Sequence, residues 1–186
     1  MTLRALQFFF FAALFSLSGA HLHAALSIGT THSLSFVDID GDKLSTADGR
    51  VTVIVLTTAA DREKARTVGD RVPEHCLGNP AYRMITIIRF TRRHTVIGQR
   101  IATALVRYGV NEEARRLQAR YKGKGIGRDA RKDIFIVTDF DGSASSQLGE
   151  SEAATGFCVF VFGRNGELLA QWHGVPSTEQ LAVAVK

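Results

Sequence analysis

The sequence predicts an α/β protein: a single domain with a central mixed sheet flanked by helices. Apolar, β-branched runs alternate along the chain with segments of helical composition, an order typical of parallel strands joined by helical crossovers. Near the C-terminus, two apolar runs flank the Gly-Arg-Asn-Gly sequence of residues 163–166, which indicates an antiparallel hairpin. The 186 residues suffice for one domain, and 45% hydrophobic with 22% charged residues is ordinary for a globular protein.

The N-terminus has the pattern of a secretory signal peptide. A short basic start at residues 1–4 precedes the apolar run 8–17, and small residues suitable for cleavage follow. The apolar run is shorter than the roughly 20 residues that a membrane span requires. We therefore predict a signal peptide over residues 1–24 and a domain over residues 25–186 that is periplasmic or secreted. An uncleaved N-terminal anchor is the alternative, and the exact cleavage site stays open.

The first half of the predicted domain begins with a hairpin. Residues 34–39 alternate between apolar and polar side chains, Asp40-Gly41 is a strong turn signal, and residues 43–45 return from the turn. The run 51–56 is continuously β-branched or apolar, which predicts a strand buried on both faces. A helix over 61–72 and an apolar strand over 84–90 follow.

The second half begins with apolar residues at helical spacing between residues 96 and 121. Gly109 predicts a break into two helices there, with Asn111 capping the second. Ser177 followed by Gln180 predicts a capping box that opens the last helix. The remaining expected elements are a basic, Gly-rich loop at 122–132, strands at 133–139, 157–162 and 168–172, a short helical start at 143–146 and the final helix at 178–185.

This order of elements resembles the thioredoxin superfamily, and its redoxin branch in particular. Residues 36–41 followed by 49–55 are similar to the opening hairpin and first core strand of that family, and residues 157–174 resemble its closing hairpin. The chain also resembles the YtfJ-type periplasmic proteins in its charged segment after the first core strand, its basic middle and its final hairpin with helix. The resemblance implies a thioredoxin-like fold over nearly the whole predicted domain.

The resemblance also locates a degenerate active site. Redox-active relatives carry Cys-x-x-Cys or one peroxidatic cysteine in the loop after the first core strand, whereas residues 57–64 contain no cysteine. Thiol exchange needs a thiolate nucleophile, which no hydroxyl or carboxylate replaces. The family's cis-proline would fall near Phe157, where this chain has no proline. The residues that stand in this degenerate-site loop are Thr57, Thr58, Asp61 and Arg62.

The chain has two cysteines, and neither lies in that loop. Cys76 follows the first predicted helix and Cys158 begins the penultimate strand, so the topology predicts opposite ends of the sheet. A disulfide requires Cα atoms within about 7 Å, and we expect none between them. Cys158 is either a buried strand residue or a relocated single thiol, and it is the candidate catalytic residue. Cys76 is the other thiol that could carry such chemistry, and which of the two is reactive stays open.

Basic residues gather in the segment 92–132 and greatly outnumber the acids there. Such a segment is usually a solvated helical face, and the alternative is a docking surface for acidic partners. The candidate partner-binding residues are Arg115, Arg116 and Arg120, and the candidate partners are an acidic envelope protein or an anionic surface. Nucleic acid is not expected, because the predicted leader removes the protein from that compartment.

No metal or other cofactor is expected from the sequence. Asp38, Asp40 and Asp42 do not form a calcium loop, because Lys43 occupies the position where the sharp turn needs glycine. The histidines have no metal-ligand spacing. The sequence therefore predicts an exported thioredoxin-fold protein without thiol redox catalysis that acts as a binding or accessory protein of the cell envelope. The alternative function is a thiol-dependent oxidoreductase or peroxidase that uses a single relocated cysteine.

Overall fold

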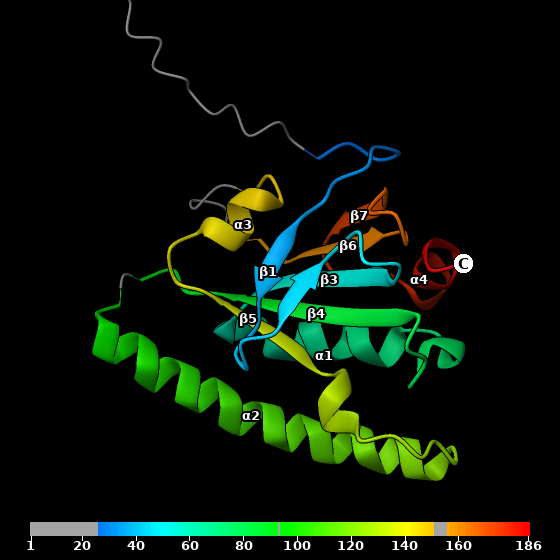
Figure 1. The fold of residues 1–186 in the computed structure, drawn as a ribbon, viewed down its shortest axis with the longest axis horizontal. Coiled ribbons are helices and arrows are strands. Elements are labelled where there is room, and N and C mark those ends of the chain that lie inside the picture. Colours follow the sequence, from blue (N-terminus) through cyan, green and yellow to red (C-terminus); the bar gives the residue numbers. More distant parts are fainter. Residues whose placement is uncertain (1–25, 93, 151–155) are drawn as a thin grey trace, which may run out of the picture.

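The structure, a computed structural model, describes residues 26–92, 94–150 and 156–186 (Figure 1). The predicted signal peptide, residues 1–24, lies outside the described residues. A five-stranded sheet has the strand order β5-β4-β3-β6-β7, in which β3, β4 and β5 are parallel and β6 and β7 are antiparallel to their neighbours. The predicted mixed sheet is thus confirmed. Its strands are β3 (Val51–Thr58), β4 (Tyr82–Arg89), β5 (Phe135–Asp139), β6 (Cys158–Phe162) and β7 (Leu168–His173).

Helices and a hairpin cover the two faces of this sheet. The helices are α1 (Arg62–Arg71), α2 (Val96–Gly123), α3 (Ser143–Gln147) and α4 (Thr178–Ala184), with short 3-10 turns η1 (Ala59–Asp61), η2 (Glu74–Cys76) and η3 (Ala130–Asp133). The hairpin consists of β1 (Ser35–Val37) and β2 (Lys43–Ser45), which form a separate two-stranded sheet. One face of the large sheet packs against α1 and α4, and the other packs against the hairpin and α3.

The central strand β3 contributes to both core clusters because alternate side chains point to opposite faces. Val53 and Val55 pack on the α1 side, whereas Ile54 and Leu56 pack on the hairpin side with Phe160 of β6. These side chains are almost completely buried. The β-branched run 51–56 therefore forms the two-sided strand that the sequence predicts.

The hairpin turn is held by one carboxylate. Asp38 Oδ1 accepts hydrogen bonds from the backbone N–H groups of Asp40 and Asp42, both at 2.9 Å. Gly41 has a φ of 93°, a conformation that favours glycine because it has no Cβ. This is the turn that Asp40-Gly41 predicts.

The predicted break at Gly109 is wrong, because α2 is one continuous helix of 28 residues. Glycine costs about 1 kcal/mol in a helix interior, and tertiary contacts of the residues that follow Gly109 offset this cost. Val110 and Tyr121 are buried, and Glu113 forms an ion pair with Arg66 of α1 at 3.4 Å. Asn111 therefore lies inside the helix and caps nothing.

The remaining predicted elements lie close to their expected positions. The helix ends beyond Lys122 and η3 occupies residues 130–133, so the predicted loop is shorter and β5 begins at Phe135. The capping box of α4 is confirmed: Ser177 Oγ accepts from the Gln180 N–H at 3.2 Å, and Gln180 Oε1 accepts from the Ser177 N–H at 2.7 Å.

The first described residues run beside β7. The N–H of Gly29 donates to the carbonyl of Leu168 and the N–H of His32 donates to the carbonyl of Gly166, each at 2.8 Å. Figure 1 shows this segment on the opposite side of the molecule from α2. Among the described residues, no helix combines the length and the apolar character that a membrane crossing needs.

Candidate functional site

The degenerate-site loop connects β3 to α1, and its polar groups are satisfied locally. Asp61 Oδ1 forms an ion pair with Lys64 Nζ at 2.8 Å, and Thr58 Oγ1 donates to Asp61 Oδ2 at 3.4 Å. The hydrogen bond from Lys64 holds the pKa of Asp61 below its usual range. Thr57 is buried and its hydroxyl donates to the Thr58 carbonyl, while Arg62 is exposed. The loop presents no side chain that could act as a redox nucleophile.

Phe157, near which the family's cis-proline would fall, lies beside Lys64 of this loop. The ring of Phe157 is buried, and Lys64 Nζ lies 6.0 Å from the ring centre. All peptide bonds in the part of the chain that the structure describes are trans. Residues 57–64 therefore carry no thiol, and the peptide bond before Phe157 is trans.

The two cysteines lie on opposite faces of the sheet and at opposite ends of it. Cys76 in η2 belongs to the core cluster on the α1 side, near the start of β4. Cys158 pairs with Leu56 near the end of β3 and belongs to the cluster on the hairpin side. Both thiols are free. They do not meet, as their places in the topology predict.

Both thiols are poor nucleophiles. Burial raises the pKa of the Cys76 thiol to about 11. Burial, together with the neighbouring Glu150 carboxylate, raises the pKa of Cys158 to about 12. The thiolate is the reactive form, so neither cysteine has an activated sulfur at neutral pH.

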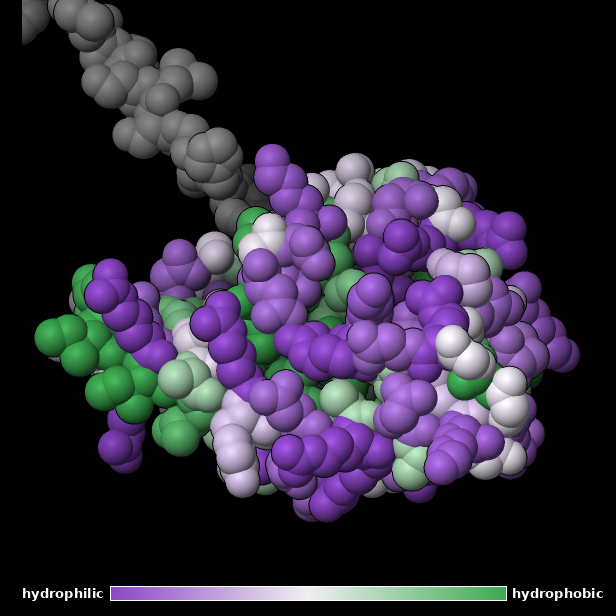
Figure 2. Space-filling model, turned by 60° about the horizontal axis from the view of Figure 1, so that its bottom comes forward, coloured by the Kyte–Doolittle hydropathy of each residue, from purple (hydrophilic) through white to green (hydrophobic). Residues whose placement is uncertain are grey.

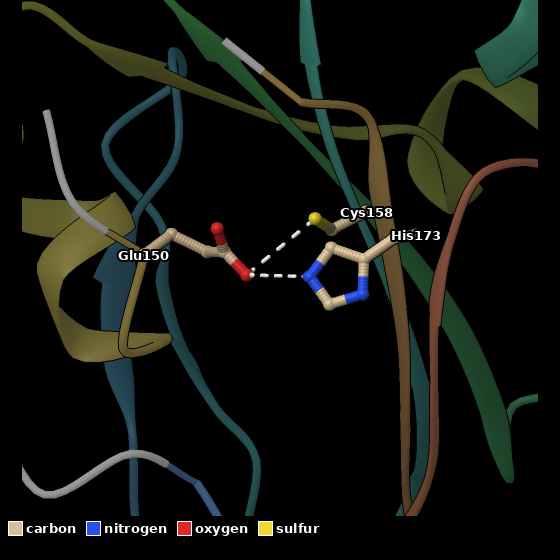
Figure 3. A group of neighbouring side chains, drawn as sticks. All are labelled: Glu150, Cys158 and His173. Carbon is tan, nitrogen blue, oxygen red and sulfur yellow. Dashed lines mark hydrogen bonds and ion pairs between the residues drawn. The ribbon is translucent and has the colours of Figure 1, made fainter. Parts of the chain in front are cut away.

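Cys158 nevertheless belongs to a polar cluster of three side chains, shown in Figure 3. Its Sγ donates to Glu150 Oε1 at 3.5 Å, and His173 Nε2 lies 3.6 Å from the same oxygen. Cys158 and His173 are direct partners in the register of β6 and β7, and Glu150 follows α3. Sequence reasoning missed this cluster, although the hairpin turn at 163–166 places residues 158 and 173 on adjacent strands.

A second feature is an exposed apolar stripe on the first half of α2. The side chains of this stripe are 58–70% exposed. They belong to Val96, Ile97, Ile101, Leu105 and Tyr108, and we call them the α2 apolar surface. From residue 97 they recur every three or four positions, so they share one side of the helix. Figure 2 shows apolar side chains gathered at this end of α2. Val110, in contrast, is buried.

Only basic charges accompany the α2 apolar surface. Arg92, Arg100 and Arg107 are exposed, and the sequence has no Asp or Glu between residues 75 and 111. Arg107 also donates to the carbonyl of Ile39. This half of the helix therefore combines exposed apolar side chains with arginines that form no ion pair within the described part of the chain.

The second half of α2 carries the predicted partner-binding arginines, and it has a different character. Arg115 forms an ion pair with Glu112 at 2.5 Å, and Arg120 forms one with Asp70 of α1 at 3.0 Å. Arg116 is exposed. Two of the three predicted arginines thus contact acids of the chain itself, and their role in partner binding stays a prediction.

Known structures share this fold. The chain is similar to the exposed lipoprotein thioredoxin Etrx1 of Streptococcus pneumoniae, with 11% identity, coverage of 83% of this chain and 98% of that one, and a TM-score of 0.52. It is also similar to DsbF of Mycobacterium tuberculosis, with 15% identity, coverage of 82% and 92%, and a TM-score of 0.51. For StoA of Bacillus subtilis the identity is 13%, the coverage 85% and 99%, and the TM-score 0.50.

No family model matches the chain, and no curated protein matches it by sequence. The sheet order, the covering helices and these neighbours together define an α/β protein with a single thioredoxin-like domain. At such low identity the neighbours establish the fold alone. The function has to come from this chain's own side chains.

Proposed function

We propose that this chain is an exported thioredoxin-fold binding protein that docks on the anionic surface of a membrane through the first half of α2. The observation that carries the proposal is the α2 apolar surface with its arginines and without acids. A basic amphipathic helix of this kind favours the boundary between lipid headgroups and acyl chains. An acidic envelope protein, the other predicted partner, accounts less directly for five exposed apolar side chains beside the arginines.

The two contributions to docking differ in size. Burying one large apolar side chain contributes about 1.5–3 kcal/mol, whereas each arginine near an anionic surface contributes about 1 kcal/mol. The apolar contribution is therefore the larger one. Salt should weaken binding without abolishing it, because only the charge contribution is screened.

Export and the lack of thiol catalysis belong to the same proposal. The predicted leader supports delivery to the envelope, and the similar Etrx1 is described as an exposed lipoprotein. The cysteine-free loop after β3 and the buried thiols, with their raised pKa values, support a binding role over redox catalysis. The likeness to DsbF is the argument for the alternative, a single-thiol oxidoreductase at Cys158, and the raised pKa of that buried thiol argues against it.

The test is co-sedimentation of the exported form with vesicles of zwitterionic lipid, with and without added phosphatidylglycerol. We expect binding to the anionic vesicles and much weaker binding to the zwitterionic ones. Leu105→Glu should lower the partition at least about tenfold, because it removes more than 1.4 kcal/mol of apolar burial.

Val183→Glu is the matched control, because Val183 of α4 is 69% exposed and Leu105 is 68% exposed. Equal binding by both variants, or no binding of the unmodified protein to anionic vesicles, contradicts the proposal. Association of the protein with a second copy or with an acidic protein, abolished by Leu105→Glu in the absence of lipid, assigns the same surface to a protein partner instead.

A further inference from the structure

We propose that Glu150, Cys158 and His173 form a binding site for Zn²⁺. Each residue offers one ligand atom, and the three atoms lie within 4.8 Å of one another. The proposal is independent of membrane docking, because the cluster lies at the start of β6 and the end of β7 rather than on α2.

The distances fit a tetrahedral zinc ion. Zn–S bonds of about 2.3 Å and Zn–O bonds of about 2.0 Å place the sulfur and oxygen about 3.5 Å apart, and the nitrogen and oxygen about 3.3 Å apart. The observed distances are 3.5 Å from Cys158 Sγ to Glu150 Oε1 and 3.6 Å from His173 Nε2 to the same oxygen. The third pair, Cys158 Sγ and His173 Nε2, lies within 4.8 Å, against about 3.5 Å in a tetrahedral zinc site, so the ion would draw these two ligand atoms together.

Two paired strands and a hydrogen-bonded turn hold the three ligands. The register of β6 and β7 pairs Cys158 with His173, so both side chains stand on the same face of the sheet. The N–H of Glu150 donates to the carbonyl of Ser145 at 3.1 Å, which fixes the turn after α3. The N–H of Ser145 in turn donates to the buried Asp139 at 2.9 Å, which ties α3 to the end of β5.

The donor set selects the metal. A thiolate and an imidazole suit Zn²⁺, whereas Mg²⁺ and Ca²⁺ prefer oxygen ligands alone. Three protein ligands leave a fourth position for water, and the side chain of His173 is 71% exposed, so the ion has a route from solvent.

The charges also balance. Binding replaces the proton of the Cys158 thiol, which leaves to solvent, and no oxidation or reduction occurs. Thiolate and carboxylate together neutralise the two charges of the ion. This matters because Arg89 is buried beside α3, where its Nε donates to Ser145 Oγ at 2.9 Å, and a site with net positive charge would be repelled by its guanidinium.

The test is titration of the untagged, exported form with Zn²⁺ alone under reducing conditions, monitored by isothermal calorimetry. We expect about one ion bound per chain, with release of protons that depends on the buffer. Co²⁺ in place of Zn²⁺ should give the sulfur-to-metal charge-transfer absorption that requires a cysteine ligand. A protein that binds neither metal overturns the proposal.

Variants separate this site from adventitious binding. His173→Ala, Glu150→Gln and Cys158→Ser should each weaken Zn²⁺ binding by more than about 100-fold, the upper end of what loss of a merely supporting residue costs. His173 is exposed, so its variant should fold even if that of the buried Cys158 does not.

Cys76→Ser and His75→Ala are the controls, because Cys76 is the other cysteine and His75 is an exposed histidine of η2. Both controls should keep the affinity and the cobalt spectrum. Retention of Zn²⁺ binding in His173→Ala, or its loss in a control, refutes the assignment.

Discussion

The two halves of α2 belong to one helix and differ in what surrounds them. The second half is anchored: Tyr121 is buried, its hydroxyl donates to Asp133 at 2.8 Å, and Arg120 pairs with Asp70 of α1. The first half leaves Leu105 and Tyr108 largely exposed. One half therefore serves the stability of the domain and the other leaves an apolar surface available for binding. Substitutions in the second half should therefore lower the stability of the domain, whereas those in the first half should lower binding and leave stability nearly unchanged.

The largest difference should appear between the two tyrosines of α2. Tyr121→Ala should lower the free energy of unfolding by about 3–5 kcal/mol, because it empties a buried aromatic site. Tyr108→Ala removes a side chain that is 70% exposed, and its effect should stay within about 0.5 kcal/mol. Urea denaturation measures both. Similar losses for the two variants would show that the first half is also packed against the domain.

The second prediction concerns alkaline pH. Burial raises the pKa of Tyr121 above its ordinary value of 10.0, with a further contribution from its hydrogen bond to Asp133. The unfolded chain therefore releases this proton first. The stabilisation is fully present below pH 10 and is lost above it, at up to about 1.4 kcal/mol per pH unit.

Tyr121→Phe should flatten the decline of unfolding free energy above pH 10, because it removes the group whose pKa is raised by burial. Denaturation series at several alkaline pH values provide the measurement. An equal decline in the Tyr121 variant would assign the alkaline loss of stability to other groups.

Gly109 lies between the anchored and the exposed half of α2. A Cβ at this position would meet no atom within 4 Å, so alanine fits without a clash. Gly109→Ala should raise the free energy of unfolding by about 1 kcal/mol, the difference in helix propensity. A rise in the thermal midpoint checks this. A fall would mean that the helix needs flexibility where its anchored and exposed halves join.

The smallest effect is expected at the ion pairs. Arg120→Ala removes a partly exposed pair with Asp70 and should cost about 0.2–1 kcal/mol, and less at high salt. Arg116→Ala is the control, because Arg116 is exposed and no ion pair is recorded for it among the described residues. Denaturation at low and high salt distinguishes them. A cost for Arg120→Ala that salt does not change would point to packing of its aliphatic stem instead of charge.

Local sequence signals predicted most of the fold. The β-branched run 51–56 was sufficient for the two-sided central strand, and Asp40-Gly41 was sufficient for the hairpin turn, because both depend on neighbouring residues. The break expected at Gly109 failed because packing of Val110 and Tyr121 outweighs a local propensity. The helical spacing of apolar residues between 96 and 121 predicted a helix that includes Ile101 and Leu105. Periodicity alone does not tell whether such residues face the core or the solvent.

The candidate zinc cluster illustrates what the sequence could not show. Its residues come from the turn after α3 and from two strands, and their spacing follows none of the short patterns of metal sites. The register of β6 and β7 explains the approach of Cys158 and His173, while the position of Glu150 depends on how α3 packs over the sheet. That packing is a tertiary event, set by side chains distant in the chain.

The pairing of the first described residues with β7 has a consequence for orientation. The segment 29–32 is hydrogen-bonded beside β7, and Figure 1 shows this first described part of the chain on the opposite side of the molecule from α2. A domain lying on a bilayer through α2 would therefore hold the start of its folded chain toward the aqueous side. If the predicted signal peptide stayed in the same bilayer, the chain would have to pass around the domain to reach that point. The proposed membrane docking through α2 is thus geometrically easier once the predicted signal peptide is removed.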